Sequence, residues 1–181
     1  DTLVVFTSDH GEMLGDHELM LKGPMLYEQA VRVPLVLRWP AVVPAGTRSP
    51  ELVQWIDLSA TILTAAGLTP IGEGQDLLPL ATTRAAGRGW ALTEYRNSGH
   101  PYADPVHLTM LRRDQWKLVV QHASPTRPRT GELYDLSNDP DEQHNLWHDP
   151  VHRDTRTDLQ EFLLDVLVAT EDRTQPRLAD W

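Results

Sequence analysis

The chain contains 181 residues, of which 40% are hydrophobic and 23% are charged, values that are ordinary for a globular protein. Sixteen Lys and Arg stand against 26 Asp and Glu, and the formal net charge of -10 argues against nucleic-acid binding, which requires a basic face. The sequence has no cysteine, which excludes disulfides and thiolate metal sites, and no apolar run approaches the roughly 18 residues needed to cross a membrane.

The beginning of the sequence carries neither an initiator methionine nor a secretory signal. Asp1 and Thr2 lead directly into an apolar run. We therefore expect a soluble chain that is part of something longer. The absence of cysteine favours a cytoplasmic over a secreted location, because disulfides are typical of exported proteins.

Two strands and one helix are predicted in the first part of the chain. Residues 2–7 form an apolar run without alternation, which is typical of a strand covered on both faces in an α/β sheet. Residues 31–39 form a second run, and Pro34 within it predicts either an edge strand or a strand that begins after the proline. A helix is predicted to begin with Asp57 as its N-cap and to end at Gly67.

The pattern changes after residues 69–89, which are rich in Gly and Pro and predict a long loop or a subdomain boundary. Strands are predicted at 91–96 and 131–136, with a hairpin at 107–121 between them. Arg and Lys alternate with apolar residues in the hairpin, so one face of this sheet is expected to be solvated. From about residue 154 to 170 an apolar stripe predicts one covering helix.

The predicted fold class is therefore α/β, in two parts. Residues 1–80 are expected to supply a portion of a main α/β domain, with a partial mixed sheet and helices. Residues 88–181 are expected to form a small antiparallel sheet subdomain with one helix.

Asp9 and His10 follow the first predicted strand directly. Adjacent residues in a strand point to opposite faces, and Gly11 permits the curl that would let both side chains address one point. A carboxylate and an imidazole there suit half of a metal site, because ligands bind at the carboxyl ends of strands in open α/β sheets. The dipeptide alone favours an ordinary N-cap aspartate beside a surface histidine, since short motifs match by chance.

Five stretches, in matching order and spacing, resemble the sulfatases of the alkaline phosphatase superfamily. They are TSDHGEMLGDH, KGPMLYE, VRVPLVLRWP, DLSATILTAAG and GELYDLSNDPDEQHNL. The resemblance covers nearly the whole chain and implies an alkaline phosphatase-like fold. It also implies the carboxy-terminal part of a metal-dependent sulfatase that hydrolyses sulfate monoesters.

Two other functions stay open. Related enzymes share the SDHGE loop, so a hydrolase of phosphonate monoesters or phosphodiesters is the first alternative. The second is a non-catalytic fragment that binds a partner or a sulfated glycan. The acidic balance and the lack of a Lys/Arg cluster count against the second alternative.

The resemblance implies roles for particular residues. Asp9 and His10 match metal ligands of the family; oxygen ligands favour Ca²⁺ or Mg²⁺, with Ca²⁺ preferred here, and imidazole also admits Mn²⁺ or Zn²⁺. Lys22 matches the catalytic lysine that holds the sulfate oxygens, where a fixed ammonium stabilises the charge of a sulfuryl group in transfer. His17 is a second catalytic candidate, as a proton donor to the leaving oxygen. His100 is a candidate for substrate binding.

The family's nucleophile is a Cys or Ser that is oxidised to formylglycine in a C/S-x-P-x-R motif. The most similar segment, at residues 123–127, has alanine at the nucleophile position, and we assign this segment no role. The resemblance therefore places formylglycine in a missing amino-terminal part, which becomes the expected partner, and the chain alone is expected to be inactive. The expected substrate is a small-molecule or glycan sulfate ester. No nucleic-acid or membrane partner is expected, and a homo-oligomer is left open.

Overall fold

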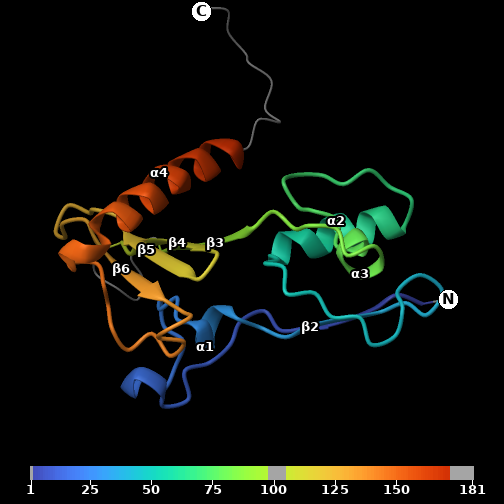
Figure 1. The fold of residues 1–181 in the computed structure, drawn as a ribbon, viewed down its shortest axis with the longest axis horizontal. Coiled ribbons are helices and arrows are strands. Elements are labelled where there is room, and N and C mark those ends of the chain that lie inside the picture. Colours follow the sequence, from blue (N-terminus) through green and yellow to red (C-terminus); the bar gives the residue numbers. More distant parts are fainter. Residues whose placement is uncertain (1, 98–104, 172–181) are drawn as a thin grey trace, which may run out of the picture.

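The computed structural model describes residues 2–97 and 105–171, which form two separate sheets and several helices (Figure 1). In the first sheet β1 (Val4–Thr7) pairs antiparallel with β2 (Leu35–Arg38). Both strands confirm the sequence predictions, and β2 begins directly after Pro34. Proline has no backbone N–H to donate to the ladder, which explains the position of that boundary.

Only one face of this first sheet is covered by the described residues. Val5, Leu35 and Leu37 pack against a small core of Leu58, Leu77 and Leu80. On the other face Val4 is 45% exposed and Phe6 is 63% exposed. The prediction of a strand covered on both faces is therefore not met within this chain.

Three helices lie between residues 28 and 82. They are α1 (Glu28–Val31), α2 (Trp55–Ala65) and α3 (Leu78–Thr82), together with the 3₁₀ turn η1 (Asp16–Glu18). The short helices α1 and α3 were not predicted, and α3 lies inside the predicted loop 69–89. Gly67 has a φ of 74° just beyond the end of α2, as expected for a helix stop.

The predicted N-cap of α2 was wrong, because the helix begins two residues before Asp57. Gln54 occupies the cap position, and the Asp57 carboxylate accepts a hydrogen bond from the Gln54 N–H at 2.7 Å. The same buried carboxylate accepts from the Gln75 N–H at 2.8 Å and pairs with Arg88. Asp57 therefore does not begin the helix; its carboxylate links the 69–89 segment to the helix.

The second sheet is an antiparallel meander in the order β3-β4-β5-β6. Its strands are β3 (Trp90–Arg96), β4 (His107–Arg113), β5 (Trp116–Gln121) and β6 (Thr130–Asp135). The predicted hairpin is present, and Asp114 in its two-residue loop has a φ of 50°. The later predicted strands and the antiparallel sheet are confirmed.

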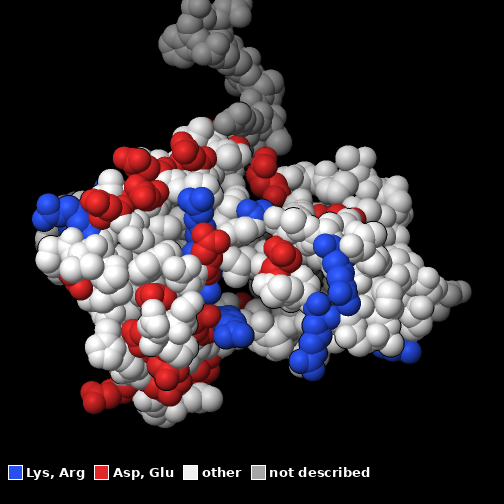
Figure 2. All heavy atoms as spheres, in the orientation of Figure 1, with Lys and Arg blue, Asp and Glu red and all other residues white. Residues whose placement is uncertain are grey.

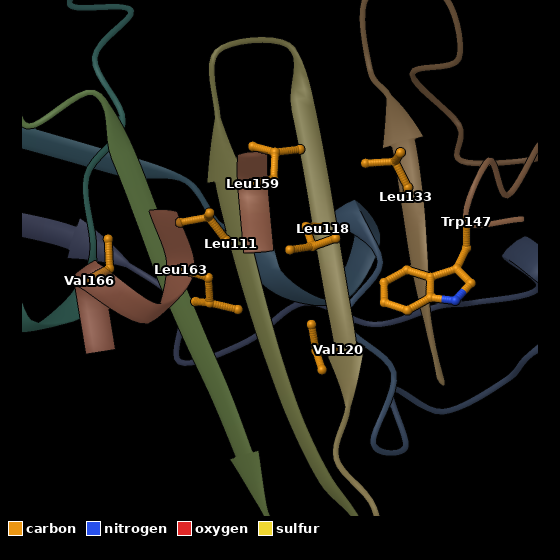
Figure 3. Packing of buried hydrophobic residues seen from close by; sticks show 8 residues of the cluster. All are labelled: Leu111, Leu118, Val120, Leu133, Trp147, Leu159, Leu163 and Val166. Carbon is orange, nitrogen blue, oxygen red and sulfur yellow. The ribbon is translucent and has the colours of Figure 1, made fainter. Parts of the chain in front are cut away.

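Helix α4 (Arg153–Ala169), preceded by the 3₁₀ turn η2 (Pro150–His152), covers one face of this meander (Figure 1). Figure 3 shows its buried side chains facing those of the strands, with Trp147 at one side. The cluster comprises Leu111, Leu118, Val120, Leu133, Trp147, Leu159, Leu163 and Val166. The predicted apolar stripe and its covering role are confirmed.

The opposite face of the meander is not solvated, which contradicts the sequence prediction. Lys117 is 0% exposed, and Val119 beside it packs with Leu26, which comes from the first part of the chain. The alternation of charged and apolar residues was real, but Lys117 faces the buried carboxylate of Glu142 and the partly buried carboxylate of Glu28 instead of water. Within the described ranges no helix is long and apolar enough to cross a bilayer.

The bare face of the first sheet leads to a prediction for the 181-residue chain expressed by itself. Exposed Val4, Phe6 and Val36, together with open strand edges, should cause self-association. Light scattering across a concentration series should show growing assemblies, and Phe6→Ser should reduce them. Val151→Ser, at an exposed valine outside this sheet, should not. A monodisperse monomer with a cooperative melt would refute the expectation.

Candidate active site

A cleft of about 1020 Å³ opens between the two parts of the molecule. Its lining residues come from β1, β2, α1, α2, β3 and β4 and from the loops between them. In Figure 2 acidic side chains gather over α4 and the small sheet, and several basic side chains lie toward the middle of this face. Asp9, His10 and Lys22 all line the cleft, so the structure brings three predicted site residues to one cavity.

Asp9 and His10 present two donor atoms side by side. His10 Nδ1 lies 2.7 Å from the Gly11 carbonyl oxygen, which can only accept, so Nδ1 carries the hydrogen and Nε2 keeps a free lone pair. Nε2 lies 3.7 Å from Asp9 Oδ2. A hydrogen bond from the His10 backbone N–H at 3.0 Å lowers the pKa of Asp9.

This pair fits half of a metal site. One carboxylate oxygen and one imidazole nitrogen with its tautomer set by a carbonyl are ordinary ligands for a divalent ion. Over the described ranges no group of three or more His, Asp and Glu side chains stands ready to complete the coordination. Further ligands would therefore have to come from elsewhere.

The turn that carries Asp9 and His10 is held in place by its neighbours. The Trp55 Nε1–H donates to the Ser8 carbonyl oxygen at 2.8 Å, and the Ser8 hydroxyl donates to the His10 carbonyl oxygen at 2.8 Å. A Cβ at Gly11 would lie 1.9 Å from the Gln29 carbonyl oxygen, so space demands glycine there. The glycine was expected for its freedom to curl, but Gly11 does not have a positive φ.

Lys22 lies in the connection between η1 and α1. The Met25 N–H donates to the Lys22 carbonyl oxygen at 3.2 Å, which closes a turn after the lysine. The side chain is partly exposed and lines the cleft together with Asp9 and His10. A cation that lines the same cleft as a carboxylate–imidazole pair can bind the oxygens of an anionic group.

His17, another predicted site residue, is not brought to this cleft. The His17 ring stacks on Tyr27, with centroids 3.9 Å apart and planes 10° apart, and it is absent from the cleft lining. His17 Nε2 is buried and finds no hydrogen-bond partner among the residues described here. His100 lies outside the described residues.

Sequence reasoning missed Trp55, which lines the cleft with a 55% exposed side chain while its N–H holds Ser8. The available signal was its position, two residues before the DLSATILTAAG stretch. Arg112 and Glu28 also line the cleft. Glu28 ends the KGPMLYE stretch but was given no role, and Arg112 had no distinguishing sequence pattern.

Comparison with solved structures defines the class of the fold as alkaline phosphatase-like. The structure of BT4656 in complex with its substrate D-glucosamine-2-N,6-O-disulfate matches with a TM-score of 0.80 at 24% identity, over 95% of this chain and 35% of that one. The phosphonate monoester hydrolase of Agrobacterium radiobacter also matches with a TM-score of 0.80, at 27% identity over 96% of this chain and 36% of that one.

Sequence comparison identifies the family. Residues 15–169 match the family described as N-sulphoglucosamine sulphohydrolase, C-terminal, and the chain belongs to this sulfatase family. It is 32% identical over 176 residues to the uncharacterized sulfatase YidJ of Escherichia coli K12, covering 95% of this chain. The chain spans about a third of the length of these similar proteins.

Proposed function

We propose that this chain is the carboxy-terminal part of a longer metal-dependent sulfatase that hydrolyses sulfate monoesters. Residues 1–80 would belong to its main α/β domain, and residues 88–181 would form the small subdomain. The observation that carries the proposal is the meeting of Asp9, His10 and Lys22 at one cleft, in a chain of a sulfatase family.

The three side chains suit sulfuryl transfer in different ways. Asp9 and His10 would hold a divalent ion, with Ca²⁺ or Mg²⁺ suited to the carboxylate, Ca²⁺ being preferred, and Mn²⁺ or Zn²⁺ admitted by the imidazole. Such an ion, when bound, stabilises negative charge on the substrate oxygens. Lys22 would contact those oxygens and not the ion, because an ammonium has no lone pair to donate.

The remaining machinery would come from the amino-terminal part, including the formylglycine nucleophile. That part would also cover the bare face of the first sheet, at Val4, Phe6 and Val36. A sulfated sugar is the favoured substrate class, because BT4656 binds a disulfated glucosamine and shares this fold. Hydrolysis of phosphonate monoesters is the second candidate, supported by the likeness to the Agrobacterium enzyme.

The test is an Asp9→Ala change in the complete protein. Because Asp9 supplies one of two neighbouring donor atoms, its loss should lower metal content and activity together. Metal analysis and kinetics on an aryl sulfate and an aryl phosphonate would measure both effects. The relative rates on the two substrates would separate the two candidate activities.

Asp16→Ala provides the matched control, since Asp16 is an exposed aspartate of the same loop region that does not line the cleft. It should leave metal content and rate unchanged. Retention of both metal and rate by Asp9→Ala would contradict the assignment. An unaltered protein that neither binds metal nor turns over either ester would favour the non-catalytic fragment.

A further inference from the structure

The segment that follows Lys22 is built onto the small sheet, on the face opposite α4. Along β5, Leu118 and Val120 point into the α4 cluster, and Val119 points the other way. Leu26 is buried in the second cluster, with Val119 and residues of β4. The chain therefore touches the small sheet only four positions after the lysine.

Glu28, whose side chain is 20% exposed, is held in an ion triad with two buried residues. Lys117 Nζ lies 2.7 Å from Glu142 Oε1 and 3.2 Å from Glu28 Oε1, and the Glu28 backbone N–H donates to Glu142 Oε2 at 2.6 Å. Lys117 is 0% exposed and Glu142 is 2% exposed. In such a low-dielectric setting these charge-assisted bonds are strong and geometrically demanding.

Tyr27, between these two anchors, is held as well. One face of its ring stacks on His17, and the ring of Tyr134 in β6 lies 6.3 Å away in a tilted arrangement. Tyr134 is buried, and burial raises the pKa of its hydroxyl, so the contact is between neutral rings. Three consecutive residues, 26 to 28, are thus fixed to the small sheet or to the loop before Lys22.

We propose that Glu28, Lys117 and Glu142 are positioning residues for Lys22, so that the small sheet sets where the ammonium stands in the cleft. The inference rests on the proposed role of Lys22 in sulfuryl transfer. A fixed cation stabilises developing charge without reorganisation, and small displacements of such a group are costly, up to about 10²-fold in rate. Loosening the triad should therefore lower kcat more than it changes KM, with metal content unchanged.

A double-mutant cycle in the complete protein tests the coupling. Glu142→Gln and Lys117→Met are each made alone and in combination with Lys22→Ala. Each triad change should lower kcat when Lys22 is present and have little further effect once Lys22 is alanine. Should Lys117→Met fail to fold, Glu142→Gln keeps side-chain volume and supplies the same comparison.

Leu163→Ala is the control for lost stability. Leu163 is buried against the other face of the small sheet and does not touch residues 26 to 28. In the Leu163→Ala background, Lys22→Ala should lower kcat by the same factor as in the unaltered enzyme. If Lys22→Ala costs the same factor in the triad variants as in the unaltered enzyme, the inference is overturned. If Lys22→Ala leaves kcat unchanged in the unaltered enzyme, both the proposed function and this inference are overturned.

Discussion

Replacement of Lys22 by alanine in the complete protein is expected to lower kcat by about 10²–10³-fold, the loss typical of one preorganised donor in an oxyanion site. Lys22 shares its cleft with Asp9 and His10, so its charge acts where an anionic substrate group and a divalent ion would meet. Because an ammonium cannot ligate a cation, metal content should not change. Steady-state kinetics on an aryl sulfate and an aryl phosphonate, with metal analysis of the same samples, would measure this.

Arg153→Ala serves as the comparison, because Arg153 is an exposed cation on α4 that does not line the cleft. It removes one positive charge from the same protein and should leave kcat unaltered. A Lys22→Ala enzyme with full activity on both substrates would show that Lys22 does not act on the anionic group.

Replacement of Lys117 by methionine is expected to destabilise the protein by about 3–5 kcal/mol. The methionine fills similar space, but the carboxylates of Glu28 and Glu142 then lose their shared cation in a buried site. Burial already raises the pKa of Glu142, and Lys117 opposes that rise. The midpoint of denaturant unfolding, followed by the fluorescence of the tryptophans, would measure the change.

Pairing Lys117→Met with Glu142→Gln should recover part of the loss, because one buried negative charge is removed together with its partner. Glu161→Gln, at an exposed carboxylate of α4, provides a matched neutralisation that should recover nothing. An unfolding midpoint for Lys117→Met close to that of the unaltered protein would mean that the triad contributes little.

Elements with strong local signals were predictable from the sequence. The stripe that includes Leu159 and Leu163 predicted α4 and its buried face. Pro34 predicted an edge strand or a strand that begins after it, and β2 begins at Leu35. Asp57 was misplaced because aspartate suits both the cap and the third position of a helix, where its carboxylate meets free backbone N–H groups. The local pattern does not distinguish the two positions.

Features that depend on contacts between distant residues were harder to predict from the sequence. The alternation around Lys117 has the same form whether the lysine faces water or a carboxylate 89 positions away. Asp9, His10 and Lys22 were identified from their sequence motif. That all three line one cleft depends on the tertiary structure, which the motif does not specify. The stacking of His17 on Tyr27 has no sequence signature, because any loop histidine can find an aromatic partner.

The bond between Glu28 and Glu142 spans 114 positions and has a consequence for synthesis. A ribosome adds about 5–20 residues per second, so the loop that carries Lys22 leaves the exit tunnel on the order of ten seconds before its last anchor. The meander and α4, by contrast, are made of sequence neighbours and can form as soon as they emerge. A nascent chain stopped before residue 142 would carry Asp9, His10 and Lys22 and still lack the contact between Glu28 and Glu142.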